Sequence, residues 1–182
     1  MDRYEPLRGR TIALVGLMGV GKSSVGRRLA AALNLPFRDA DTEVETAAGR
    51  SIPEIFAALG EAAFRDGERR VIARLLEGPP HVLATGGGAF MNPETRALIK
   101  AQAISVWLKA DLEVLARRVG RKDTRPLLTG KDPMEVLKAQ AEVRYPIYAE
   151  ADITVETGDA AHQVTVNHVL KAIAEHIGAP VE

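Results

Sequence analysis

The sequence predicts a three-layer α/β/α fold built on a central parallel five-stranded sheet. Three observations lead to this prediction. Strand-sized apolar segments alternate with amphipathic helical segments, the first strand segment is apolar on both faces, and a glycine-rich turn joins it to the first helix. The length of 182 residues is typical of one compact domain, so we expect a single domain over residues 1–182 with a small mobile lid.

Five segments are predicted to be strands. Residues 11–15 read Thr-Ile-Ala-Leu-Val and have no polar face, as expected for a central strand that helices cover on both sides. The other four segments are residues 36–38, 81–85, 104–108 and 153–155. Helical segments lie between them, which is the order that produces parallel strands.

The helical segments repeat apolar residues every three or four positions, as Val25, Leu29 and Leu33 do within residues 22–33. Further helices are expected over residues 41–59 (broken at Gly49 and restarted at Pro53), 61–77, 93–101 with Asn92 as cap, 111–119, 133–149 as far as Pro146, and 161–177. Residues 120–131 break the helical pattern with charges, a proline and two glycines, so we place the mobile lid at about residues 120–132.

The amino-acid composition excludes several classes of partner and of functional site. The 24 basic and 24 acidic residues cancel, which gives no reason to expect nucleic acid or an anionic membrane as a partner. The absence of cysteine excludes disulfides, thiolate metal sites and a cysteine nucleophile. No apolar run is long enough to span a bilayer and no export signal is evident, so the cytoplasm is the expected location. Four histidines show no metal spacing and are interpreted as structural or surface residues: His81, His162, His168 and His176.

Residues 16–23 fit the phosphate-loop motif G-x-x-x-x-G-K-[ST] at every fixed position. The loop follows a predicted strand and opens a predicted helix, where backbone amides and the helix N-terminus together attract phosphate groups. Lys22 can reach the β- and γ-phosphates, and the Ser23 hydroxyl can bind Mg²⁺. We therefore predict binding of a nucleoside triphosphate with Mg²⁺ as cofactor, through Gly19, Val20, Gly21, Lys22, Ser23 and Ser24.

The phosphate loop alone does not define a kinase. The chain has neither the long apolar strand ending in Asp of large ATPases nor the Asn-Lys-x-Asp guanine motif of GTPases. Small size and a basic lid favour a metabolite or nucleotide kinase. Asp39 and Asp41 follow the second strand segment, which we expect beside the phosphate-loop strand, where substrate and metal meet in such sheets. The alternative is that Asp41 only caps the helix that begins near Thr42.

Four further motifs occur in order along the chain: Gly60-Glu61-x-x-Phe64-Arg65, Gly86-Gly87-Gly88, Arg125-Pro126-Leu127-Leu128 and Arg144-x-Pro146-x-Tyr148. With the phosphate loop they resemble shikimate kinases, and the resemblance extends from that loop to Tyr148. It implies a P-loop kinase fold and transfer of the γ-phosphate of ATP to the 3-hydroxyl of shikimate, in chorismate and aromatic amino acid biosynthesis. It also implies that residues 41–77 form the shikimate-binding helices.

The resemblance also implies roles for single residues. Arg65 and Arg144 would hold the shikimate carboxylate. Asp41 would accept hydrogen bonds from the hydroxyls and take the proton of the 3-hydroxyl. Gly86, Gly87 and Gly88 would border the substrate, with Gly87 offering its backbone N–H.

Further implied roles concern ATP. Asp39 would act as an outer Mg²⁺ partner through water, with Ser23 as the direct ligand. Arg125 on the lid would neutralise the transferring phosphoryl group together with Lys22, so the catalytic set is Asp41, Lys22 and Arg125. Arg118 would pack against adenine.

Other interpretations stay open at this stage. Arg65 could be solvated, Arg118 could belong to a surface charge cluster, and Glu61 could either orient Arg65 or cap its helix. Residues 157–162 depart from the family pattern, because the loop that touches adenine commonly contains proline and a basic residue and here has neither Pro nor Arg. The expected partners are shikimate and ATP, and the expected state is a monomer. The rival functions are a gluconate kinase-like enzyme and a nucleotide-binding regulatory domain without catalysis.

Overall fold

A computed structural model describes residues 4–120 and 130–179 and contains the predicted sheet. Its strands are β1 (Thr11–Val15), β2 (Phe37–Asp39), β3 (Val82–Ala84), β4 (Ala103–Lys109) and β5 (Ile153–Glu156). All neighbours are parallel, in the order β2-β3-β1-β4-β5. The predicted five-stranded parallel sheet is confirmed. The expectation that the second strand lies beside the phosphate-loop strand is wrong, because β3 lies between β2 and β1.

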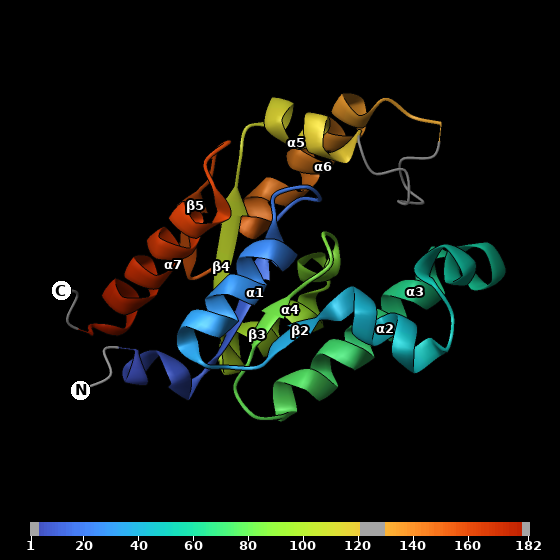
Figure 1. The fold of residues 1–182 in the computed structure, drawn as a ribbon. Coiled ribbons are helices and arrows are strands. Elements are labelled where there is room, and N and C mark those ends of the chain that lie inside the picture. Colours follow the sequence, from blue (N-terminus) through green and yellow to red (C-terminus); the bar gives the residue numbers. More distant parts are fainter. Residues whose placement is uncertain (1–3, 121–129, 180–182) are drawn as a thin grey trace.

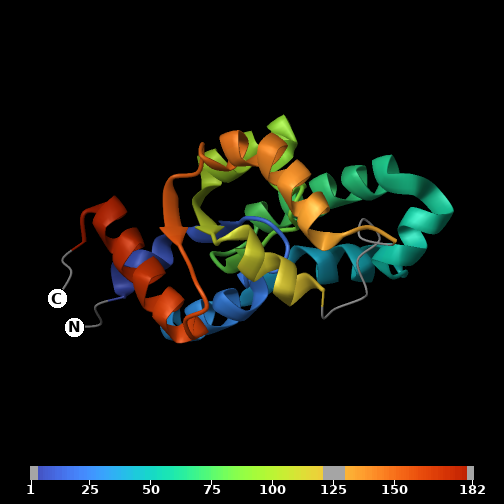
Figure 2. The same cartoon turned by 90° about the horizontal axis from the view of Figure 1, so that it is seen from above.

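Helices cover both faces of this sheet. They are η1 (Glu5–Gly9), α1 (Lys22–Leu33), α2 (Ala40–Ala48), α3 (Ile52–Glu77), η2 (Ala89–Met91), α4 (Pro93–Gln102), α5 (Leu112–Val119), α6 (Pro133–Tyr148) and α7 (His162–Ile177). Figures 1 and 2 show α1 and α7 together on one face of the sheet and α4 and α6 on the other. The predicted three layers are therefore present. All five residues of β1 are buried, as its apolar sequence requires.

Helices α2 and α3 form an arm that extends beyond the β2 edge of the sheet (Figure 1). Two glycines shape this arm. Gly49 ends α2 with a φ of 65°, and Gly60 has a φ of 86° that divides α3 into two helical halves. Glycine adopts positive φ values far more readily than other residues do. This explains why the predicted helices are interrupted at Gly49 and after Leu59. A small separate core holds the arm together through Val44, Ile55, Phe64 and Val71.

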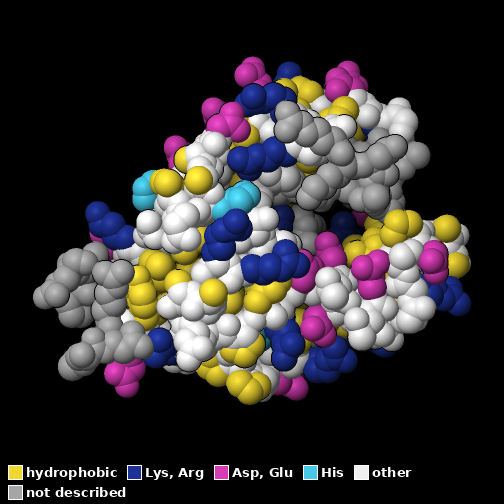
Figure 3. Space-filling view, viewed as in Figure 1, with side chains coloured by type: hydrophobic (Ala, Val, Ile, Leu, Met, Phe, Trp, Pro, Cys, Tyr) yellow, Lys and Arg dark blue, Asp and Glu magenta, His cyan; other side chains and the backbone are white. Residues whose placement is uncertain are grey.

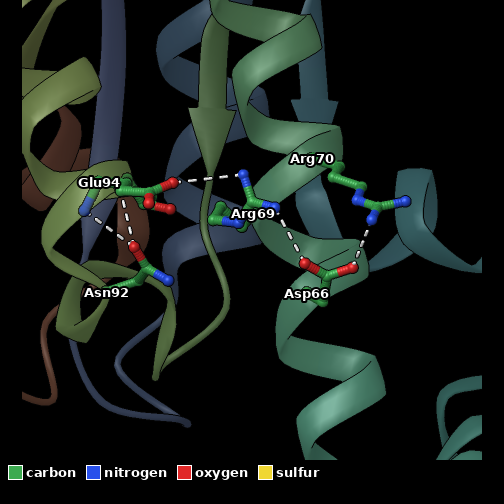
Figure 4. Close-up of polar contacts among 6 residues, drawn as sticks. Asp66, Arg69, Arg70, Asn92 and Glu94 are labelled. Carbon is green, nitrogen blue, oxygen red and sulfur yellow. Dashed lines mark hydrogen bonds and ion pairs between the residues drawn. The ribbon is translucent and has the colours of Figure 1, made fainter.

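Polar contacts join α3 to the start of α4 (Figure 4). Asp66 accepts a 2.9 Å hydrogen bond from Arg69 and lies 3.1 Å from Arg70. Arg69 also donates to Glu94 at 3.3 Å. Asn92 accepts from the Glu94 amide at 2.9 Å, which confirms the predicted cap of α4.

The prediction that the sixth helical segment ends at Pro146 is wrong, because α6 continues to Tyr148. Proline lacks the N–H that would bond the carbonyl of Glu142, one turn earlier. Both Pro146 and Glu142 are exposed, so water can reach the freed carbonyl, while Tyr148 is fully buried and anchors the last turn. Within the described residues, none of the helices is long and apolar enough to cross a membrane.

Candidate functional site

The turn between β1 and α1 has the backbone of a phosphate cradle. Gly16, Gly19 and Gly21 have φ values of 148°, 82° and 99°, which side chains strongly disfavour. A Cβ at Gly16 would also lie 2.6 Å from the Leu108 carbonyl oxygen. The Lys22 ammonium bends back over the turn and donates to the carbonyl of Gly16 at 2.6 Å. These features fit the predicted phosphate loop.

Ser23 and Asp39 meet beside this loop. The Ser23 hydroxyl donates a 2.6 Å hydrogen bond to Asp39 Oδ2, although β3 separates β2 from β1. The other oxygen, Oδ1, accepts from the backbone amides of Asp41 at 3.0 Å and Thr42 at 3.3 Å. Asp39 therefore caps α2, and the alternative in which Asp41 is the cap is wrong.

The Ser23–Asp39 pair fits the chemistry of Mg²⁺. This ion prefers oxygen ligands and commonly binds through one or two carboxylates together with phosphates and waters. Among residues 4–120 and 130–179, no group of three or more His, Cys, Asp or Glu side chains could hold a metal. A hydroxyl and a carboxylate beside a phosphate loop match a Mg²⁺ site that protein and nucleotide form together, in which the phosphates of the nucleotide supply the remaining ligands.

A cleft of about 530 Å³ opens above the carboxyl ends of the strands. Most of the predicted residues line it: Gly19, Gly21, Lys22, Ser23, Ser24, Asp39, Asp41, Gly86, Gly87 and Arg118. The side chain of Val20 is buried, so this residue can contribute only its backbone. Figure 3 shows the surface hollowed between the main body and the α2–α3 arm, with acidic and basic side chains around the hollow.

The triple-glycine turn after β3 is the point where the side chains of Asp41, Arg65 and Arg144 converge. A Cβ at Gly86 would lie 2.7 Å from Glu68 Oε2 and 3.0 Å from Asp41 Oδ1. Such contacts are too close for a real side chain. The absence of side chains on this turn therefore lets functional groups approach the backbone itself.

The next two glycines face the two arginines. A Cβ at Gly87 would lie 3.0 Å from Arg144 Nη1, and one at Gly88 would lie 2.7 Å from the Arg65 guanidinium. Both arginines line a second hollow of about 400 Å³, which adjoins the turn. Gly87 also lies next to the phosphate loop, since its Cβ position is 3.7 Å from the Gly16 carbonyl oxygen. Arg65 and Arg144 thus meet at one turn, and the interpretation of Arg65 as a solvated residue is wrong.

Sequence reasoning missed Glu68, which holds Arg65 in place. Its Oε1 accepts a 3.0 Å hydrogen bond from Arg65, and its side chain is 4% exposed. Glu61 lies farther away, at 3.6 Å, and is 56% exposed. Burial raises the pKa of Glu68, an effect that the charge and hydrogen bond of Arg65 oppose. The available signal was weak: Glu68 follows Arg65 by three residues on the same helical face as Phe64 and Val71.

Arg118 connects the phosphate loop to the segment after β5. Its guanidinium donates to the carbonyl of Gly19 and to that of Gly158, both at 3.1 Å. The neighbouring Arg117 pairs with exposed Asp159 at 2.8 Å, and Arg118 lies 4.0 Å from the same carboxylate. Arg118 is thus partly exposed, but its guanidinium lines the cleft beside the phosphate loop.

His162 was interpreted as structural or surface, but it lines the cleft at the start of α7. Its imidazole lies beside the phosphate loop, with Cε1 3.3 Å from the Cβ position of Gly21. Burial lowers the pKa of His162, and the charges of Arg28 and Arg118 add to this effect. The loop that lacks proline and arginine thus contributes an aromatic side chain to the site. Arg125 and most of the predicted lid, residues 121–129, lie outside the described residues.

Comparison with known proteins agrees with this geometry. The family model "Shikimate kinase" matches residues 18–174. A shikimate kinase from Caulobacter vibrioides is 72% identical over 174 residues, covering 96% of this chain and 87% of that protein. A shikimate kinase from Paramagnetospirillum magneticum is 60% identical over 169 residues, covering 93% and 87%.

Solved structures are similar as well. A shikimate kinase from Acinetobacter baumannii in complex with shikimate superposes with a TM-score of 0.91 at 37% identity, covering 94% of this chain and 97% of that one. A gluconokinase from Sinorhizobium meliloti has a TM-score of 0.61 at 20% identity, covering 92% and 93%, which shows a shared fold only. The chain belongs to the shikimate kinase family.

Proposed function

We propose that this chain is a shikimate kinase, which transfers the γ-phosphate of ATP to the 3-hydroxyl of shikimate and releases ADP. One observation carries the proposal. A single glycine turn contacts Asp41, Arg65 and Arg144 and also borders the phosphate loop, so groups for a hydroxylated acid and for a triphosphate share one site. The similarity to an Acinetobacter baumannii shikimate kinase in complex with shikimate supports this choice of acceptor.

Arg65 and Arg144 would bind the substrate carboxylate. Guanidinium groups form charge-assisted hydrogen bonds with carboxylates, often as bidentate pairs. Glu68 is placed to orient Arg65 through its 3.0 Å hydrogen bond. Binding the acid at this end of the glycine turn directs the ring hydroxyls toward Asp41, which contacts the other end at Gly86.

The phosphate loop would bind ATP through its backbone amides, Lys22, Ser23 and Ser24. Lys22 now donates to loop carbonyls and would exchange these bonds for phosphate oxygens. Ser23 and Asp39 would hold Mg²⁺, Ser23 directly and Asp39 through water. When bound, Mg²⁺ neutralises charge on the phosphate oxygens. Arg125, from the lid, would do the same at the transferring group.

The reaction would be an in-line displacement. The 3-hydroxyl oxygen forms a bond to the γ-phosphorus, the bond from that phosphorus to the ADP oxygen breaks, and Asp41 takes the hydroxyl proton. The protein supplies positioning and charge stabilisation rather than a covalent intermediate.

Arg118 and His162 would flank the nucleobase. Both line the same cleft as the phosphate loop, and a planar guanidinium and an imidazole ring can each stack on a purine. Every side chain named here comes from one chain, so we infer that a monomer is sufficient for activity. ATP and a small metabolic acid as substrates suit an enzyme of the cytoplasm.

Coupled ADP release tests the proposal. Purified enzyme with ATP and Mg²⁺ should release ADP rapidly with shikimate, and only at the background rate with gluconate, nucleoside monophosphates or no acceptor. Asp41→Asn should retain ATP binding and lower kcat by about 10²-fold or more, since positioned general bases contribute about that much. Equal rates with gluconate and shikimate would refute the proposal.

A further inference from the structure

We propose that Tyr148 is a positioning residue that sets the orientation of the Gly87–Gly88 peptide and of Arg144, and thereby places the acceptor. This inference rests on the proposed function, because it assigns these groups to the acceptor site. Tyr148 itself is fully buried at the end of α6, so it acts through the groups that it contacts.

The first contact is with the glycine turn. The Tyr148 hydroxyl donates a hydrogen bond to the carbonyl oxygen of Gly87. In a planar trans peptide, the C=O of one residue and the N–H of the next point in opposite directions. Because the Gly87 carbonyl is turned toward Tyr148, the Gly88 N–H is directed to the opposite side of the turn, away from the buried ring. A glycine pair has no side chains to restrain this peptide, so the phenol supplies the restraint.

The second contact is with Arg144, one helical turn earlier on α6. Tyr148 and Arg144 lie on the same face of α6, and the positive charge of Arg144 opposes the rise in the pKa of the phenol. Arg144 Nη1 in turn lies 3.0 Å from the Cβ position of Gly87. The phenol therefore donates to the acceptor-side turn, while the same helix places the acceptor-side arginine against that turn, and this arrangement fixes the position of each relative to the other.

The phenol is itself held firmly. Its ring packs against Trp107 and Tyr145, with centroids 5.7 Å and 6.4 Å away. Burial raises the pKa of Tyr148 to about 12, although the positive charge of Arg144 opposes the rise. The hydroxyl thus keeps its proton, and can donate to Gly87, throughout the pH range of metabolism.

Tyr148→Phe removes the hydroxyl and leaves the ring, and Tyr145→Phe is the matched control. Tyr145 belongs to the same aromatic cluster and lies three residues earlier on α6, but its ring packs between Trp107 and Lys109. We expect Tyr148→Phe to raise the KM for shikimate about tenfold, since one buried hydrogen bond is lost, while the KM for ATP stays within about twofold. Tyr145→Phe should leave both KM values within about twofold of wild type.

A second measurement does not depend on activity. In ¹⁵N-glycine-labelled protein, Tyr148→Phe should shift the amide signals of Gly87 and Gly88, and Tyr145→Phe should not. Equal shikimate KM values in the two variants, a parallel rise in the KM for ATP, or unmoved glycine signals would each overturn the inference. An inactive wild type would refute the proposed function instead, and the glycine signals would still test the role of Tyr148.

Discussion

The buried carboxylate of Glu68 accepts a 3.0 Å hydrogen bond from Arg65, whose guanidinium lies directly against Gly88. The arginine is thus held from two sides before any substrate arrives. Holding a binding group in its working geometry lowers the entropy lost when the ligand binds.

Glu68→Gln keeps the shape of the side chain but weakens the hydrogen bond by removing its charge. The KM for shikimate should rise about tenfold, which corresponds to ~1.4 kcal/mol, while the KM for ATP should change little. Glu61→Gln is the comparison, because Glu61 is exposed and lies 3.6 Å from Arg65. It should change the shikimate KM less than about twofold, as exposed ion pairs contribute little. Equal effects of the two variants would show that the buried pair has no special role.

The raised pKa of Glu68 also predicts a pH dependence of stability. The folded protein keeps the Glu68 proton to a higher pH than the unfolded chain, whose carboxyl titrates near 4.5. As pH rises above about 4.5, the unfolded state loses its proton first, so the contribution of this carboxyl to the free energy of unfolding falls until the folded pKa is passed.

Urea unfolding of wild type and Glu68→Gln between about pH 4.5 and pH 8 measures this effect. The free energy of unfolding of wild type minus that of the variant should decrease as pH rises. Glu77→Gln, at the exposed end of α3, serves as control and should show a smaller change. A constant difference between wild type and Glu68→Gln over this range would contradict the assignment.

Asp39→Asn tests the proposed Mg²⁺ site. Asparagine caps a helix about as well as aspartate, so α2 should persist while the negative charge is lost. The Mg²⁺ concentration that gives half-maximal rate should rise about tenfold or more. Asp132→Asn makes the same change at the cap of α6 and should leave the Mg²⁺ dependence as in wild type. An unchanged Mg²⁺ dependence in Asp39→Asn would remove Asp39 from the metal site.

His162→Ala tests the proposed nucleobase contact. Removing one stacking ring should raise the KM for ATP about threefold to tenfold and leave the KM for shikimate within about twofold, because His162 lies on the phosphate-loop side of the cleft. His168→Ala, at an exposed position on the same helix, is the matched control. If both variants bind ATP equally well, the nucleobase does not contact His162.

Much of the fold could be predicted because its signals are local. Gly16, Gly21 and Lys22 define the phosphate loop within eight residues, and the glycine breaks of the α2–α3 arm follow from backbone freedom. The order of the strands could not be predicted from local signals. The pairing of β2 with β3 rather than with β1 depends on contacts between segments that are distant in the sequence. Pro146 was misjudged for a similar reason: tertiary burial of Tyr148 outweighs the local preference of proline.

The residues of the candidate site also divide into those that local motifs identify and those that only the packed structure reveals. The sequence motifs contain Asp41, Arg65 and Arg144, and the structure brings these three residues together at the glycine turn. Glu68 was missed because a glutamate on a helix usually faces solvent, and only the packed structure shows its burial. His162 was missed because its place in the cleft depends on how α7 packs against the phosphate loop, which no local pattern records.

We propose that Arg65 and Arg144 bind a carboxylate while the hydroxyl beside Asp41 receives the phosphate. Turnover of shikimate compared with its methyl ester tests this most directly, because the ester keeps every hydroxyl and loses only the negative charge. The claim predicts that kcat/KM for the acid exceeds that for the ester by about 10²-fold or more, since two guanidiniums would lose a charged partner. Equal kcat/KM values for the acid and the ester would contradict it.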